Sequence, residues 1–231
     1  MTNSYKLNYS IPIQIIGKGD NMKQILCFGD SNTYGLIPAA NDRYPWGIRW
    51  TSILDENIKK YNYRVVEEGL CGRTTIFDDP LRVGRNGSKL ISVLLETHRP
   101  VDIVVIMLGT NDCKAVYDAN ARVIGKGIER ILDSTYNINK DSKVLIVSPI
   151  RLGDGVWEDG FDPEFDEKSV ETSKKLEEVY REVAKKRNTY FLAASDYADP
   201  SAEDREHMDE AGHKAFAEAI TEKIKEIIDD I

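Results

Sequence analysis

The chain has 231 residues, of which 41% are hydrophobic and 30% are charged, so it is long enough to bury the core of one sizeable domain. Its formal net charge of −8 argues against the basic face that nucleic-acid binding needs and disfavours anionic membranes, so we expect neither partner. The 3 cysteines and 3 histidines are scattered and form no metal-binding or disulfide pattern, so we expect no metal and no cofactor.

The first 21 residues differ from the rest of the chain. They contain an apolar run at residues 11–16 that Pro12 and Gln14 interrupt, without the basic region and cleavage site of a secretory signal. No segment reaches the roughly 20 apolar residues that span a bilayer. We therefore expect a cytoplasmic protein in which residues 1–21 are an added arm or a start-site extension and residues 22–231 form the working domain.

Strand-like and helix-like segments alternate along this domain. The expected strands are residues 24–28, 63–67, 101–108, 144–148 and 189–192. The expected helices are residues 50–60, 88–97, 121–134, 170–187 and 210–228. This alternation predicts βαβ units and an α/β fold with a doubly wound parallel sheet.

Two long irregular stretches interrupt the pattern, at residues 37–49 and 151–168. Loops of this length in a compact domain are usually functional or mobile. The first contains Tyr44 and Trp46 and either narrows a substrate pocket or serves as a contact between subunits. The second contains Trp157 among acidic residues and is either a lid that shapes the substrate site or a solvated acidic loop.

A serine follows the first expected strand directly, in the motif Gly29-Asp30-Ser31. Open α/β sheets bind their ligands at the carboxyl ends of the strands. A strand that ends in this motif before a helix therefore presents the Ser31 hydroxyl at the edge where such a protein carries out its chemistry.

Three further pieces follow downstream in order. Gly72 comes soon after the second strand, Gly109 and Asn111 follow the third, and Asp204 precedes His207 by three residues before the last helix. Each piece alone is a common turn pattern. Together they supply a nucleophile, hydrogen-bond donors and an acid that can orient a histidine base.

This set resembles the SGNH (GDSL-type) hydrolase superfamily, and longer stretches resemble its bacterial arylesterase and acyltransferase branch. The matching stretches are residues 25–31, 67–70, 73–75 with 78–80, and 107–112. The resemblance covers the chain from about residue 23 to the last helix, densely to about residue 114 and thinly from there to residue 199. It implies a flavodoxin-like three-layer α/β/α sandwich, which agrees with five predicted parallel strands.

The resemblance also implies a role for each matching residue. Ser31 is the expected nucleophile, His207 the general base and Asp204 the residue that orients it. The expected oxyanion hole consists of the Ser31 N–H, the Gly72 N–H and the Asn111 side chain. Two positions depart from the family pattern: close relatives often carry a small non-glycine residue at Gly72, and the usual Asp-Gly-x-His reads Asp-Arg-Glu-His here.

Other residues receive secondary roles. We expect Asp30, Gly109 and Asp112 to support the turns that hold the site. Candidate pocket residues are Trp46, Cys71, Cys113 and Trp157.

Two histidines compete with His207 for the role of base. His213 lies four residues after Asp209, but it shares a helical face with apolar residues and is expected to pack in the core. His98 lies at a helix end and is expected to cap it or to lie at the surface.

These residues predict a serine esterase that hydrolyses small carboxylic esters, acetyl-like or aryl, through an acyl-enzyme on Ser31, with acyltransferase activity as an extension. The alternatives are a carbohydrate O-deacetylase or a lysophospholipase- or thioesterase-like hydrolase with the same site. A non-catalytic binding module that retains the fold is a third hypothesis, which the intact site disfavours. We expect a small neutral ester as substrate and a homo-oligomer.

Overall fold

Five parallel strands form one sheet in the order β2-β1-β3-β4-β5. The strands are β1 (Lys23–Gly29), β2 (Tyr63–Gly69), β3 (Ile103–Met107), β4 (Lys143–Ser148) and β5 (Tyr190–Ala193). The computed structural model describes residues 22–230, so the expected arm at residues 1–21 lies outside the described residues. The predicted α/β class and the five-stranded parallel sheet are confirmed.

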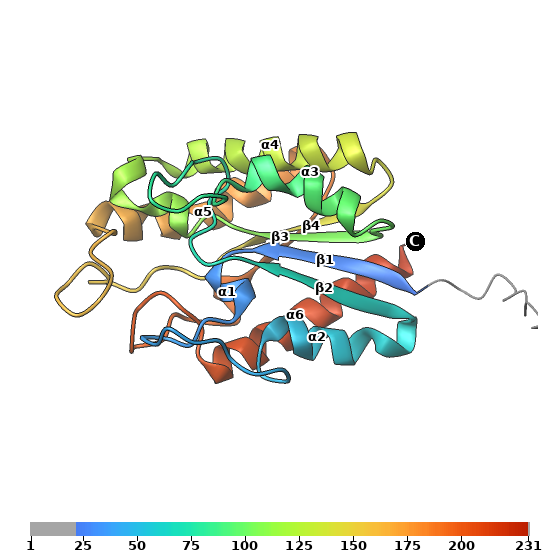
Figure 1. Ribbon diagram of the computed structural model, residues 1–231, viewed down its shortest axis with the longest axis horizontal. Helices are drawn as coiled ribbons and strands as arrows, with labels where there is room; N and C mark the ends of the chain where they lie inside the picture. Colours follow the sequence, from blue (N-terminus) through green and yellow to red (C-terminus); the bar gives the residue numbers. More distant parts are fainter. Residues whose placement is uncertain (1–21, 231) are drawn as a thin grey trace, which may run out of the picture.

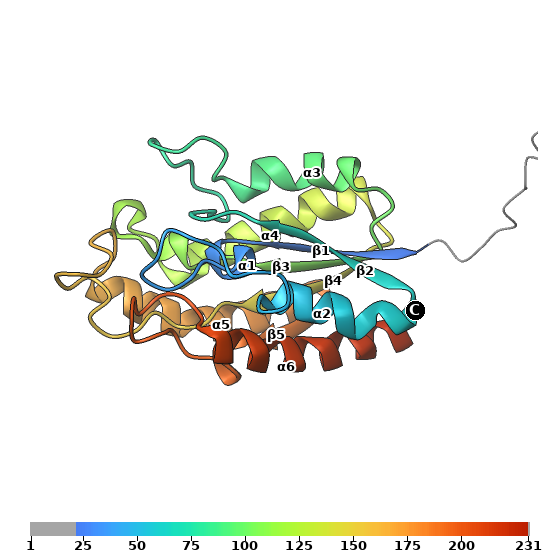
Figure 2. The same cartoon turned by 60° about the horizontal axis from the view of Figure 1, so that its bottom comes forward.

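Helices cover both faces of the sheet and complete the three predicted layers (Figure 1). One layer contains α3 (Gly87–Thr97), α4 (Ala121–Ile138) and α5 (Glu167–Arg187). The other contains α2 (Trp50–Ile58) and α6 (Glu210–Asp229), which lie side by side (Figure 2). Each layer encloses its own hydrophobic core against the sheet.

The central strand β3 explains why the sheet is buried on both faces. All of its side chains are buried, and they alternate between the two cores, with Val104 and Ile106 on one side and Ile103 and Val105 on the other. A continuous apolar run is what a parallel strand between two helix layers requires.

The ends of some helices differ from the expected boundaries for local reasons. Helix α2 stops at Ile58 because the next residues form a 3₁₀ turn that ends at Asn62 in the left-handed conformation. Helix α5 starts earlier than expected because Asp166 and Ser169 form a reciprocal capping box at its start. The long second loop therefore gives its last two residues to α5.

The strand order decides where the site can form. Strand β1 lies between β2 and β3, so the loops that follow these three strands meet at one end of the sheet, beside the short helix α1 (Ser31–Tyr34) (Figure 1). Such a change in strand order opens a crevice at the carboxyl ends of the strands. Within residues 22–230, no helix has the length and apolarity needed to cross a membrane.

Candidate active site

Ser31 is the first residue of α1, directly beyond the end of β1. The Asp30 carboxylate caps this helix by accepting a hydrogen bond from the Asn32 N–H at 3.0 Å. A side chain at Gly29 would collide with Thr33, so the close approach of helix and strand requires glycine there. Ser31 is only 3% exposed, so its side chain is almost entirely covered.

His207 and Asp204 reach Ser31 from the loop before α6. His207 Nε2 lies 2.8 Å from Ser31 Oγ, and His207 Nδ1 lies 2.7 Å from Asp204 Oδ2. Asp204 and His207 are neighbours because the Asp204 Oδ1 accepts the N–H groups of Glu206 and His207, each at 2.9 Å. This is an Asx-type turn rather than the helical turn that the spacing suggests. The Ala39 N–H donates a further hydrogen bond to Asp204 Oδ2 at 3.1 Å.

Asn32 fastens the histidine loop to the serine helix, a role that the sequence did not reveal. Its Oδ1 accepts the Met208 N–H at 2.9 Å, and its Nδ2 donates to the Glu206 carbonyl at 3.3 Å. These bonds flank His207 on both sides. They fix the imidazole relative to the neighbouring Ser31, and the only sequence signal for them is the position of Asn32 directly after the serine.

Gly72 lies in the loop after β2 with a φ of +80°, a conformation that glycine adopts without strain. A Cβ at this position would lie 2.8 Å from the guanidinium of Arg82. The loop is fastened to β1 because Arg73 Nη1 donates to the Gly29 carbonyl at 2.8 Å. Within the described part of the chain, neither the Gly72 N–H nor the Ser31 N–H donates a hydrogen bond, so both are available to an anionic oxygen.

Asn111 follows β3 and is buried. Its Nδ2 donates to the Arg73 carbonyl at 3.2 Å, which fixes the plane of the amide and leaves the second N–H for another acceptor. Asp112 accepts hydrogen bonds from the Thr75 N–H, at 3.0 and 2.9 Å to its two oxygens, and from the Thr75 hydroxyl. It therefore supports the site by joining the loops after β3 and β2.

Three acidic side chains set the electrostatics around the imidazole. Burial alone would lower the pKa of His207, but Glu206 and Asp204 outweigh it and raise that pKa to about 9. Burial raises the pKa of Glu206 to about 7, and its Oε1 lies 3.7 Å from His207 Nε2. Burial also raises the pKa of Asp30, to about 6. The pKa of Asp204 is lowered because its bonds to His207 outweigh the effect of burial.

Arg205 occupies the position where the family pattern has glycine, and its φ is +59°. Its side chain turns away from the imidazole and binds the long loop at residues 151–168. Arg205 Nη1 donates to the Gly155 carbonyl at 2.9 Å and to Glu158 at 2.7 Å, and the guanidinium lies 4.0 Å from the ring centroid of Phe161. These contacts anchor the loop beside His207 and make it a wall of the site.

A cleft of about 350 Å³ opens beside His207. Its walls come from three loops and include Leu36, Ala39, Phe161, Pro163, Glu203 and Glu206. Leu36 also borders a second cleft of about 280 Å³ that Cys71 helps to line. Of the catalytic candidates, Asp204 and His207 line the first cleft, and the second cleft adjoins it at Leu36.

The other three candidate pocket residues lie elsewhere. Trp46 is 52% exposed and lies at the surface, where the Arg49 guanidinium is 5.4 Å from its ring centroid. Cys113 is 5% exposed and belongs to the core, because its Sγ donates to the Gly109 carbonyl at 3.4 Å. Trp157 packs against the same core.

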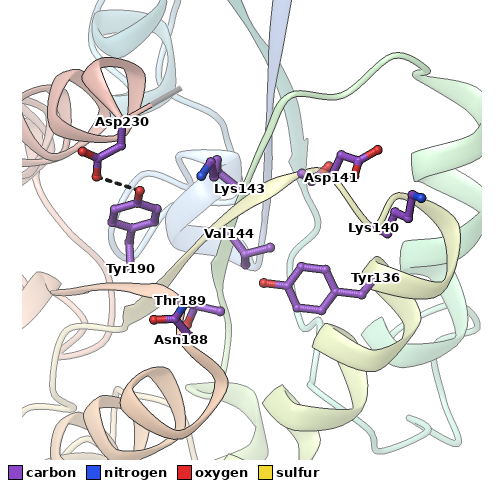
Figure 3. A pocket seen from close by; sticks show the side chains of 10 residues that line it. Tyr136, Lys140, Asp141, Lys143, Val144, Asn188, Thr189, Tyr190 and Asp230 are labelled. Atoms are coloured by element: carbon purple, nitrogen blue, oxygen red, sulfur yellow. Dashed lines mark hydrogen bonds between the residues drawn. The ribbon is translucent and has the colours of Figure 1, made fainter.

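A larger cavity of about 450 Å³ lies at the opposite end of the sheet. It is lined by residues at the start of β4 and β5, among them Lys143 and Tyr190, whose hydroxyl bonds to Asp230 (Figure 3). None of the candidate site residues lines it. The volume of a cavity alone therefore does not identify the active site of this protein.

The competing histidines have structural partners. His213 is fully buried, its Nδ1 accepts the Trp50 N–H at 3.4 Å, and burial lowers its pKa to about 4. His98 Nε2 lies 2.7 Å from Glu68. Across residues 22–230, no group of three His, Cys, Asp or Glu side chains is placed to hold a metal ion.

Comparisons with known proteins show which family the chain resembles. The sequence profile of the GDSL-like lipase/acylhydrolase family matches residues 27–215. No curated protein sequence matches the chain significantly.

Solved structures give closer matches. A carbohydrate acetylesterase from Sinorhizobium meliloti is 32% identical, with a TM-score of 0.82 over 89% of this chain and 99% of that chain. The aryl esterase of M. smegmatis is 31% identical, with a TM-score of 0.80 over 88% of this chain and 99% of that chain.

Proposed function

The chain belongs to the GDSL-like lipase/acylhydrolase family and is a serine carboxylic ester hydrolase, and on this basis we propose that it hydrolyses small neutral esters through an acyl-enzyme on Ser31. The observation that carries the proposal is the unbroken contact from Ser31 Oγ through the His207 ring to Asp204, at 2.8 and 2.7 Å. The three residues have the arrangement of a nucleophile, a base and an orienting acid.

The first half-reaction follows from these contacts. His207 Nε2 takes the proton of Ser31 as Oγ attacks the ester carbonyl carbon. Asp204 accepts the Nδ1 proton in a hydrogen bond, keeps Nε2 as the basic nitrogen and stabilises the imidazolium that forms. The imidazolium then protonates the leaving alcohol, and water repeats the cycle to release the acid.

Three donors surround the place where the carbonyl oxygen becomes negative. These are the unpaired N–H groups of Ser31 and Gly72 and the second N–H of Asn111. Preorganised donors of this kind stabilise the tetrahedral intermediate, and each contributes about 10²–10³ in rate. We assign the oxyanion hole to these three groups.

The size and charge of the site support a short, neutral substrate. The first cleft, of about 350 Å³, is near the lower limit of the roughly 300–1,000 Å³ typical of ligand pockets, and the second, of about 280 Å³, is just below it. The carboxylates of Glu203, Asp204 and Glu206 line the first cleft and would repel an anionic ester. An acetyl ester of a neutral alcohol fits both the small volume of the clefts and the negative charge of their walls.

A carbohydrate O-deacetylase is the second candidate. It is favoured by the likeness to a carbohydrate acetylesterase and by a cleft in which the Phe161 ring lies with several carboxylates. Rings and carboxylates of this kind can contact sugar faces and sugar hydroxyls. A lysophospholipase- or thioesterase-like activity would require a longer acyl site than these hollows offer.

The experiment compares p-nitrophenyl acetate, p-nitrophenyl octanoate and an acetylated oligosaccharide. We expect kcat/KM for the acetate to exceed that for the octanoate by at least about tenfold, since a fully buried alkyl chain needs space that the clefts lack. Faster turnover of the octanoate would overturn the short-acyl assignment. No hydrolysis of any activated acetate would overturn the proposed reaction.

We propose three further properties in addition to ester hydrolysis. They are acyl transfer to alcohols, assembly into a homo-oligomer and a cytoplasmic location. Light scattering coupled to size-exclusion chromatography tests the second, and a propyl acetate product formed in the presence of 1-propanol tests the first.

A further inference from the structure

Glu206 has a largely buried carboxylate that receives no hydrogen bond from the residues that the structure describes. The residue is 7% exposed, and its side chain donates or accepts no hydrogen bond within residues 22–230. Its backbone is fixed on both sides, because its N–H donates to Asp204 and its carbonyl accepts from Asn32. The Glu206 carboxylate oxygens are not fully buried, so water from the cleft can reach them, and a bound molecule that supplies a hydrogen-bond donor would take the place of that water.

Glu206 is one of the residues that line the cleft beside the reacting nitrogen. Glu206 lines the 350 Å³ cleft together with His207, and its Oε1 lies 3.7 Å from His207 Nε2. A hydrogen bond spans roughly 2.8 Å, so the two atoms are close enough for one oxygen atom to bond to both. The side of Nε2 that receives the proton of an attacking hydroxyl is therefore bordered by a free acceptor.

The nearby positive charge does not satisfy this acceptor. The Lys114 ammonium bonds to Glu164 and lies 3.9 Å from Asp162, so it is already paired. Arg205 points to the loop at residues 151–168. Both cations are engaged elsewhere, and Glu206 remains available to a ligand in the cleft.

We propose that Glu206 selects the acyl acceptor by accepting a hydrogen bond from its second hydroxyl donor, so that water and vicinal diols are preferred over simple alcohols. The inference rests on the proposed acyl-enzyme at Ser31. In the step itself, the acceptor oxygen bonds to the acyl carbon, the bond from that carbon to Ser31 Oγ breaks, and the acceptor proton passes through His207 Nε2 to Oγ. Glu206 gains and loses no proton.

The preference follows from counting donors. A simple alcohol has one O–H group, which must point to Nε2 when the oxygen attacks, and it leaves Glu206 unpaired. Water has a second O–H on the same oxygen, and a vicinal diol has one on the adjacent carbon. An ionised carboxylate accepts hydrogen bonds and donates none. It therefore favours an acyl acceptor that carries this second O–H group over one that lacks it.

The same site holds the leaving alcohol in the first half-reaction, because deacylation by an alcohol is the reverse of acylation. The chemical class of substrate is therefore an acetyl ester whose alcohol carries a free hydroxyl next to the ester oxygen, as in a partly acetylated polyol or sugar. The role of Glu206 therefore restricts the proposed substrates from neutral esters in general to this class.

The test measures how the acyl-enzyme partitions between two matched acceptors. The enzyme receives p-nitrophenyl acetate at pH 8, above the Glu206 pKa of about 7, with equal concentrations of 1-propanol and 1,2-propanediol. Gas chromatography gives the ratio of the two acetate products. The variants are Glu206→Gln, Glu206→Leu and the control Asp159→Asn, which removes an exposed carboxylate outside the cleft.

We expect the native enzyme to favour the diol by about tenfold, the factor that one hydrogen bond to a charged group supplies. In Glu206→Leu the ratio should fall to about two, the value expected because the diol has two hydroxyl groups and the alcohol has one. It should take an intermediate value in Glu206→Gln and stay unchanged in Asp159→Asn. Because the ratio is counted per acyl group transferred, a slower variant still gives a valid result.

Two results would overturn the inference. One is a native enzyme that shows no preference for the diol, and the other is a preference that survives in Glu206→Leu. Both are distinct from failure of the proposed function, in which the native enzyme releases no p-nitrophenol. If Glu206→Leu does not fold, the native ratio and the Glu206→Gln ratio decide the question.

Discussion

Glu206 Oε1 lies 3.7 Å from His207 Nε2, the nitrogen that also faces Ser31 Oγ. The negative charge of this carboxylate stabilises the protonated imidazole and, with Asp204, raises the pKa of His207 to about 9 in spite of burial. Only the neutral imidazole can take the proton of Ser31. The arrangement therefore affects the pH at which the enzyme works as well as the acceptor that it binds.

The first prediction is an alkaline pH–rate profile. We expect kcat/KM for p-nitrophenyl acetate to rise with pH with a midpoint near pH 9, because half of the His207 side chains have lost their proton at the pKa of about 9. In Glu206→Gln, the loss of the negative charge should lower the midpoint by about one pH unit. A native midpoint near 6.5, or a midpoint that Glu206→Gln leaves in place, would contradict this electrostatic account.

The second prediction concerns Gly72. Alanine at this position meets both a φ of +80° and the Arg82 guanidinium, so the loop must shift and carry its N–H away from the oxyanion. We expect Gly72→Ala to lower the free energy of unfolding by about 1–2 kcal/mol and kcat by at least about tenfold. Urea unfolding and initial rates measure the two effects.

Gly84 provides the matched control for this substitution. Its φ is +82°, but a Cβ there would meet nothing within 4 Å. Gly84→Ala should therefore show a loss of stability from the backbone strain alone and keep kcat within about twofold. Equal kinetic losses in the two variants would mean that the Gly72 N–H has no special part in catalysis.

The third prediction concerns Asn111. Its side chain is held by the Arg73 carbonyl, which leaves the other N–H for the proposed oxyanion. Replacing it with alanine should lower kcat by about 10²–10³ and change KM by less than about threefold, because the donor acts on the oxyanion and not on the bound ester. A loss confined to KM would assign Asn111 to substrate binding instead.

The fourth prediction concerns the buried carboxylate of Asp112. Burial raises its pKa from 3.8 to about 7, although the bonds from Thr75 act in the opposite direction. The folded protein therefore holds a proton that the unfolded chain releases, and this contribution to stability is lost as the pH rises from about 4 to about 7. Over that pH range, the free energy of unfolding should therefore decrease less in Asp112→Asn than in the native protein. The difference between the two decreases should be on the order of 2 kcal/mol.

Urea unfolding at pH 4, 5.5 and 7 measures the difference, and Asp159→Asn, an exposed carboxylate, serves as the control for the lost charge. Asp30 contributes in the same direction in both proteins, because burial raises its pKa to about 6. If the native protein and Asp112→Asn show the same dependence on pH, the Asp112 carboxylate is ionised in the fold and its bonds to Thr75 outweigh burial.

The convergence of the site could be predicted from the sequence because of where the strands end. Ser31, Gly72 and Asn111 each follow a short apolar run, and runs that alternate with helices form a parallel sheet whose carboxyl ends meet at one edge. Local signals also set most boundaries, although the capping box starts α5 earlier than the apolar periodicity indicates.

The contacts between distant side chains could not be read in the same way. Asp112 finds its partner Thr75 37 residues away, and Asn32 binds the histidine loop across 174 and 176 residues. The sequence places Cys113 next to the site motif, but its side chain turns into the core. Such directions depend on packing between elements, which no local pattern encodes.

The central claim is that Ser31 carries the acyl group, and covalent labelling tests it most directly. The protein is treated with a fluorophosphonate, digested and mapped by mass spectrometry, beside the Ser31→Ala variant. The account predicts one phosphonylated residue, Ser31, with label and p-nitrophenyl acetate hydrolysis both lost in Ser31→Ala. Label on another residue, or a Ser31→Ala variant that hydrolyses the ester at the native rate, would contradict it.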